Sequence, residues 1–199
     1  MHTILMLMAL AAAPFWESKP PAEWSEVELS WMLHASPWVQ AATCENKIGG
    51  IAPVEVYLAS AQPMREAEEQ LRLRHRKKGA STTAQEELDQ EYLGFMADNP
   101  GKYMVLAVRF PNRNALADAV EAKRMEEESL LKVRRKKYKI VGHFPPTSSD
   151  PYLRLIYPRV VETTDKEFTF ELYLPAAAAP YRAALFKVKE LIYRGAPDM

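Results

Sequence analysis

Glu167-Phe168-Thr169-Phe170-Glu171-Leu172-Tyr173-Leu174 is the stretch of this 199-residue chain that decides the fold most clearly. Its apolar residues alternate with polar ones, which is the period of two expected of a β-strand with one buried face. The same alternation occurs at Leu131 and Val133, and again at Leu153, Leu155 and Tyr157. Because short links separate these strands, we expect them to pair antiparallel.

Helix signals lie earlier in the chain. Ser25-Glu26-Val27-Glu28 is a capping box, and it predicts a short helix that stops at Ser36-Pro37. Residues 64–78 predict a second helix, and a third follows the cap at residues 81–83 and ends at Asn99-Pro100-Gly101; we expect these two helices to pair as a hairpin. Asn114 is predicted to cap a further helix that contains Leu116 and Val120.

The remaining segments complete the fold prediction. Residues 103–108 are almost continuously apolar, which favours a central strand, and residues 38–60 predict a β-hairpin that turns at Gly49-Gly50. We therefore predict a single α+β domain over residues 20–195, mainly an antiparallel sheet with a short N-terminal helix and a central helical hairpin packed on it.

Three tryptophans, Trp24, Trp31 and Trp38, recur at intervals of seven residues. Trp31 shares the predicted helix face of Val27 and His34, so we expect this face to pack into the core. The alternative is that the tryptophans form a surface for a sugar or a protein partner.

The first residues indicate an export signal. An apolar run from Ile4 to Trp16 is too short to span a bilayer, so we predict a signal peptide over residues 1–13 and a periplasmic or extracellular protein with no membrane span after cleavage. Because the run lacks Lys and Arg, two alternatives to this signal peptide stay open. The true start codon lies further upstream, or the run is a helix of a cytoplasmic protein. Cys44 is the only cysteine, which excludes an intramolecular disulfide.

Charge points to local patches rather than to an overall field. Lys and Arg number 26, and Asp and Glu also number 26, so no specific nucleic-acid binding is expected. One run is strongly basic: Lys132, Arg134, Arg135, Lys136, Lys137 and Lys139. It predicts either an anion-binding patch or a solvated hairpin tip whose lysines discourage edge-to-edge strand pairing.

Motifs for catalysis are missing from the sequence. His34, Cys44, His75 and His143 lack the short spacings of a preassembled metal site, and there is no nucleophile elbow, phosphate loop or dinucleotide fingerprint. Asp165 and Glu167 are interpreted as a surface carboxylate pair. We therefore assign no catalytic, cofactor-binding or metal-binding residue and expect no cofactor.

Ordered fragments of the chain resemble a family of uncharacterised exported or envelope-associated proteins of soil bacteria. The fragments are Trp24-Ser25 with Ser36-Pro37-Trp38, Ser60-Ala61-Gln62-Pro63-Met64-Arg65-Glu66-Ala67, Tyr157-Pro158-Arg159, Asp165-Lys166-Glu167, and Phe186-Lys187-Val188-Lys189-Glu190-Leu191-Ile192-Tyr193-Arg194-Gly195. The resemblance implies an exported α+β protein and supplies no substrate or catalytic residue. Within these fragments Arg65, Arg159 and Lys166 fall at junctions between elements, where we expect structural roles rather than ligand binding.

These observations lead to one functional expectation and one alternative. We expect a non-enzymatic exported module that binds a protein or an anionic envelope partner, with an unknown oligomeric state. The alternative is a hydrolase whose site is assembled from distant residues, which would need a pocket with convergent polar groups.

Overall fold

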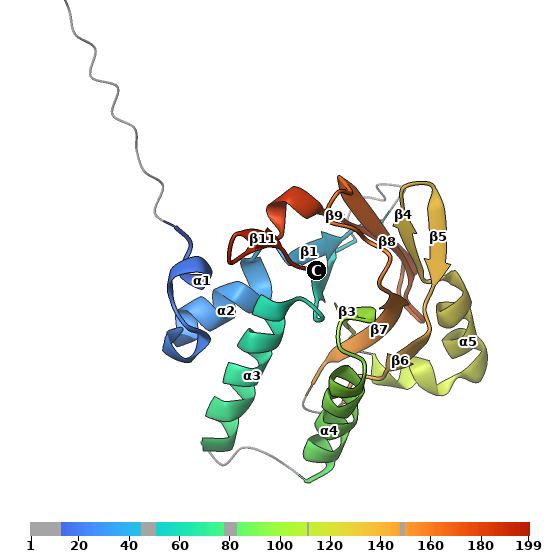
Figure 1. The fold of residues 1–199 in the computed structure, drawn as a ribbon. Helices are drawn as coiled ribbons and strands as arrows, with labels where there is room; N and C mark the ends of the chain where they lie inside the picture. The colour runs from blue at the N-terminus through green and yellow to red at the C-terminus, as the bar shows by residue number, and fades with distance from the viewer. Residues whose placement is uncertain (1–12, 45–50, 78–82, 111, 148–149) are drawn as a thin grey trace, which may run out of the picture.

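The computed structural model describes residues 13–44, 51–77, 83–110, 112–147 and 150–199 (Figure 1). Nearly all of the predicted signal peptide and the Gly49-Gly50 turn therefore lie outside the described residues. The fold is α+β, as predicted, and every strand pair is antiparallel.

The strands form two main sheets and a small ribbon. The five-stranded sheet has the order β1 (Val39–Ala42), β2 (Val54–Leu58), β3 (Tyr103–Arg109), β7 (Tyr152–Pro158), β6 (Gly142–Phe144). The four-stranded sheet has the order β5 (Lys136–Lys139), β4 (Leu130–Val133), β8 (Glu167–Tyr173), β9 (Tyr181–Lys187). The ribbon pairs β10 (Ile192–Tyr193) with β11 (Ala196–Pro197).

The core lies between the two sheets. On β8 the alternation has the predicted outcome, because Phe168, Phe170 and Leu172 are buried while Glu167 is exposed. Tyr157 of β7 packs against Phe170, with ring centroids 4.9 Å apart. The central strand β3 is buried on both faces over residues 104–108, which confirms its prediction.

One corner joins the sheets. The backbone of Thr43, just past β1, exchanges hydrogen bonds of 3.0 and 2.8 Å with Ala183 of β9. The predicted hairpin of residues 38–60 is also confirmed, since β1 and β2 pair antiparallel. The polar backbone at this corner is thereby satisfied by strand pairing.

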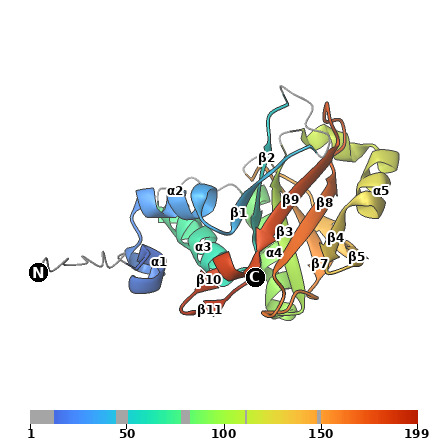
Figure 2. The same ribbon diagram turned by 90° about the horizontal axis from the view of Figure 1, so that it is seen from above.

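Helices surround the sheets. They are α1 (Phe15–Ser18), α2 (Glu26–Ala35), α3 (Gln62–Lys77), α4 (Thr83–Asp98) and α5 (Ala119–Glu128), with 3-10 turns at Pro21–Glu23, Arg113–Ala117 and Val188–Glu190. Seen from above, α1, α2 and α3 lie on one side of the sheets and α5 on the other (Figure 2). Both helices of the predicted central pair are present, but α3 packs along α2, and α4 rests on the sheet through Tyr92 and Phe95.

The face that α2 buries was predicted wrongly. Its capping box is confirmed, since the Glu28 amide donates to Ser25 Oγ at 3.1 Å and the Ser25 amide donates to Glu28 Oε2 at 2.8 Å. The buried residues, however, are Leu29, Met32 and Leu33. Val27 is 78% exposed, and Trp31 stacks on Trp16 of α1 at 5.0 Å between centroids instead of entering the core.

The helix predicted after Asn114 begins later than expected. Asn114 lies in the 3-10 turn, and Asp118 caps α5 by accepting from the Val120 amide at 2.8 Å. Val120 is exposed, and Met125 is the residue that α5 buries. An aspartate is a stronger N-cap than the surrounding apolar residues, and its position fixes the helix start.

Candidate functional site: the His34 groove

Two adjoining hollows lie between α2, α3 and the start of β7. Their volumes are about 180 and 270 Å³, and both are lined by Leu33, His34, Leu71 and His75. We call these hollows together the His34 groove. The first hollow also reaches the polar side chains Tyr57, Glu68, Arg72, Asp150, Tyr152 and Arg154.

Helix geometry places the α3 wall of the groove. Glu68, Leu71, Arg72 and His75 follow one another at spacings of three, one and three residues, so they share one face of the helix. Helix α2 supplies Leu33 and His34 at its last turn. The groove is thus formed where the end of one helix crosses the flank of the next.

The floor of the groove is a buried ion network around Arg154 of β7. Arg154 is 8% exposed; its guanidinium donates to Glu68 Oε1 at 3.1 Å and also to Asp150 Oδ2. Tyr57 Oη donates to the same Glu68 oxygen at 2.6 Å. Buried charges are tolerated only when they are paired and hydrogen-bonded, so these residues depend on one another.

Burial keeps the network in fixed protonation states. Burial raises the pKa of Tyr57 well above its usual value, and the neighbouring Glu68 adds to this shift. Burial alone lowers the pKa of Arg154, but Glu68, Tyr57 and Asp150 outweigh it and raise the pKa well above the usual value. Tyr92 of α4, whose ring lies 4.7 Å below the guanidinium carbon, also has a pKa raised by burial. The phenols therefore stay neutral and the guanidinium stays charged near neutral pH.

A second set of hydrogen-bonded polar side chains lies at the rim of the groove. His34 Nδ1 lies 3.1 and 3.2 Å from the two oxygens of Glu55, and Tyr152 Oη donates to Glu55 Oε1 at 2.7 Å. Burial and the bond to Glu55 raise the pKa of Tyr152. This set of side chains fixes the orientation of the imidazole, because Glu55 is itself held from the other side. Within the described ranges, His34 Nε2 and the whole His75 ring have no hydrogen-bond partner.

The basic run predicted from the sequence occupies a different place. Its residues belong to the β4–β5 hairpin, which turns at Arg134 and Arg135, with Arg134 in the left-handed region at φ 58°. Arg134 binds Asp165 at 2.7 and 3.0 Å and Glu162 at 3.0 Å. Hydrogen bonding by Arg134 lowers the pKa of the Asp165 carboxyl.

Two of its lysines are also paired with acids. Lys132 and Lys137 approach the Glu171 carboxylate at 3.7 and 2.6 Å. Arg135, Lys136 and Lys139 are exposed and have no ion-pair partner among the described residues. The hairpin thus brings the six predicted cations together, but neighbouring acids neutralise part of their charge.

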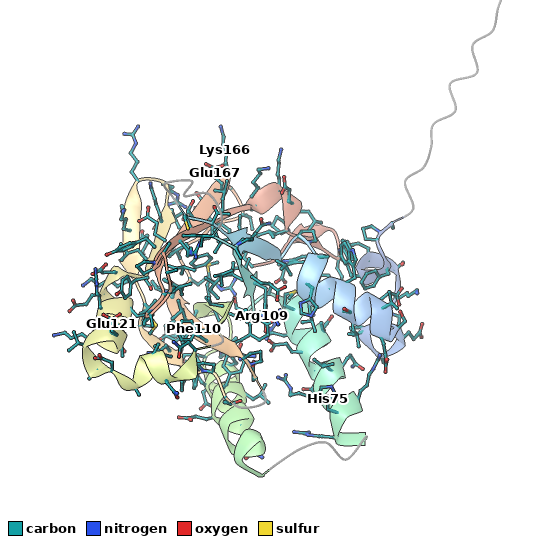
Figure 3. The ribbon with its side chains drawn as sticks, turned by 180° about the vertical axis from the view of Figure 1, so that it is seen from behind. His75, Arg109, Phe110, Glu121, Lys166 and Glu167 are labelled. Carbon is teal, nitrogen blue, oxygen red and sulfur yellow. The ribbon has the colours of Figure 1, made fainter. Side chains whose placement is uncertain are left out.

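The other residues considered from sequence are scattered. Figure 3 shows Lys166 and Glu167 at one edge of the molecule and His75 far from them on α3. His143 Nδ1 lies 3.2 Å from Glu126 on α5, away from the groove. Cys44 Sγ contacts a guanidinium nitrogen of the buried Arg182. These positions do not combine into one site.

The junction residues also stay apart from the groove. Arg65 lies in the first turn of α3 and Arg159 directly follows β7. Partial burial lowers the pKa of Arg159, as does the positive charge of Arg65, while Asp198 opposes both effects. Arg159 therefore lies within electrostatic reach of Arg65 and Asp198.

Among the described residues, no cluster of three or more His, Cys, Asp or Glu side chains could hold a metal ion. No helix in the described ranges is both long and apolar enough to cross a bilayer.

The groove was not predicted from the sequence. Its groups come from α2, β2, α3 and the segment that enters β7, so no local motif contains them. The one available signal was the shared helix face of Glu68, Leu71, Arg72 and His75.

Comparison with known proteins assigns neither a family nor a function to this chain. No protein-family model matches the chain, and no curated protein or solved structure shows significant similarity to it.

Proposed function

We propose that this protein is an exported, non-enzymatic binding module and that the His34 groove is its ligand site. One observation carries the proposal: exposed apolar surface and unpartnered imidazole nitrogens meet above a floor whose charges are already paired. Such a combination of apolar walls and a few convergent polar groups is what ligand sites have in common. Export is supported by the apolar segment at residues 4–16.

The state of the floor favours binding over catalysis. General acid–base catalysis needs a group whose pKa lies near the working pH. Tyr57, Tyr92 and Arg154 are all shifted away from that range. These residues can therefore hold the walls in place but cannot exchange protons readily near neutral pH.

Filling the groove tests the proposal with a neutral probe. Leu71 is 37% exposed on the groove wall, so Leu71→Trp places a large ring in the hollow without disturbing the core. We expect saturable Nile red binding, measured by fluorescence, to weaken about tenfold. Leu185→Trp, at a 43% exposed position on β9, is the control and should leave binding unchanged. Equal binding by both variants would contradict the proposal.

The hydrolase remains the second candidate because of the chain from Tyr152 through Glu55 to His34. An imidazole whose Nδ1 is held by a carboxylate is the arrangement of a general base that acts through Nε2. A hydrolase predicts turnover of p-nitrophenyl acetate or p-nitrophenyl phosphate that is lost in His34→Gln and kept in His143→Gln. Release of p-nitrophenol no faster than in buffer would reject this candidate.

A further inference from the structure

Two carboxylates of the groove, Glu68 and Asp150, have little capacity left for a ligand. Glu68 Oε1 accepts from Tyr57 and Arg154, and its Oε2 lies 3.7 Å from Arg72 Nη1. Asp150 accepts from Arg154 and, at 3.1 Å, from the backbone amide of Tyr152. A ligand that brings hydrogen-bond donors would therefore compete with partners that are already in place.

Donors, in contrast, are available at the rim when the histidines are protonated. With Nδ1 donating to the Glu55 carboxylate, Nε2 of His34 is an acceptor in the neutral ring and a donor in the imidazolium, and both nitrogens of a protonated His75 donate. His34 has Nδ1 occupied by Glu55 and Nε2 unoccupied, and His75 has neither ring nitrogen engaged among the described residues. Leu33 and Leu71 supply apolar surface next to both histidines. The complementary ligand brings acceptor oxygens and an apolar tail.

We propose that the His34 groove binds an amphipathic oxyanion, a carboxylate or phosphate group on an apolar tail, with the oxyanion at His34 and His75 and the tail over Leu71. This inference rests on the proposed function, because it names the ligand class of the same groove. A phosphate or carboxylate group accepts several hydrogen bonds and is favoured by charged donors.

The two histidines decide the charge of the groove. Its other charged lining residues balance: Arg72, Arg74 and Arg154 against Glu26, Glu68 and Asp150. Two carboxylates outside the lining also contribute negative charge next to the groove. Glu55 contacts His34, and Glu69 pairs with Arg72.

Protonation of the histidines therefore makes the groove more positive. The groups that face His34 are Glu55 of β2, Tyr152 of β7 and, across the groove, Arg72 and His75 of α3. His75 lines both hollows, so the charged groups that share them with it are Glu26 of α2, Glu68, Arg72 and Arg74 of its own helix, and Asp150 ahead of β7 and Arg154 within it. Histidine is the side chain that changes charge between about pH 5 and 8. Because the protonated form attracts an anion more strongly than the neutral form, we expect oxyanion affinity to be higher at lower pH.

The experiment uses probes that share one alkyl tail: hexanoate, hexyl phosphate, hexanol and hexylamine. Each is titrated into the full chain near pH 5.5 and pH 7.5, and amide and imidazole chemical shifts are followed by NMR. We expect saturable shifts at the groove with hexanoate and hexyl phosphate, and hexanoate should bind about threefold to tenfold tighter at the lower pH. Hexanol should bind weakly without pH dependence, and hexylamine more weakly still.

Variants separate the head-group contacts from the tail contacts. The double variant His34→Gln and His75→Gln should lose the pH dependence and the preference for anions but keep hexanol binding, whereas His143→Gln should behave as the wild type. A larger shift with hexanoate than with hexyl phosphate, or the reverse, identifies which oxyanion the groove prefers and supports the proposal in either case. Equal, pH-independent binding of all four probes overturns the oxyanion inference and leaves the groove as a binding site. No saturable shift with any probe overturns both.

Discussion

The β4–β5 hairpin and the His34 groove use charge in opposite ways. The hairpin gathers its cations within eight residues of sequence, on the surface, where Asp165, Glu162 and Glu171 pair with three of them. The groove draws its charges from distant segments and buries them around Arg154. A dense run of charged residues in the sequence therefore does not identify the strongest charge–charge interactions. Burial strengthens an ion pair more than a high number of neighbouring charges does.

The largest expected effect comes from breaking the floor network. Glu68→Leu leaves Arg154 buried with Asp150 as its remaining carboxylate partner and removes the acceptor of Tyr57. We expect the free energy of unfolding, measured by urea denaturation, to fall by about 3 kcal/mol.

The neighbouring glutamate provides the control for this substitution. Glu69 is about half exposed and pairs with Arg72 at 3.2 Å, so Glu69→Leu should change the free energy of unfolding by less than about 1 kcal/mol. Comparable losses in the two variants would show that the buried network is no stronger than a surface pair.

A much smaller effect is expected at the hairpin. Arg134→Ala removes the hydrogen bonds that lower the pKa of Asp165, so that pKa should rise toward its usual value in an NMR titration. Because the folded-state pKa is lowered, this pair contributes stability above the unfolded-state pKa of the aspartate and loses it as the pH falls. Any difference in stability between Arg134→Ala and the wild type should therefore be present at neutral pH and vanish in acid.

The adjacent arginine is the matched control. Arg135 has no ion-pair partner among the described residues, so Arg135→Ala should leave the Asp165 titration unchanged. A shift of the same size in both variants would mean that the general field of the hairpin, rather than the bidentate contact, acts on Asp165.

Much of the fold could be predicted from the sequence because its signals are local. Phe168 and Phe170 alternate with polar residues within one strand, and Ser25 and Glu28 cap α2 within one turn. Interactions between residues close together in the sequence determine such features. The prediction for Trp31 failed because its neighbour Trp16 belongs to a separate helix, whose packing no pattern within α2 reveals.

The candidate site could not be predicted for the same reason. Arg154 and Glu68 are 86 residues apart in the chain, and His34 and Glu55 are 21 residues apart. In β7, Arg154 alternates with apolar neighbours, and this pattern predicts that its side chain faces solvent. Only the packing of α3 against β7 turns it into the centre of a buried network.

Hexanoate binding to the full chain, mapped by NMR near pH 5.5, distinguishes the His34 groove from the β4–β5 hairpin as the ligand site. We expect the shifts to converge on His34, Leu71 and His75 and to disappear in Leu71→Trp, while Lys136 and Lys139 at the hairpin stay unchanged. Shifts that follow the hairpin lysines and ignore Leu71→Trp would contradict the proposed groove site.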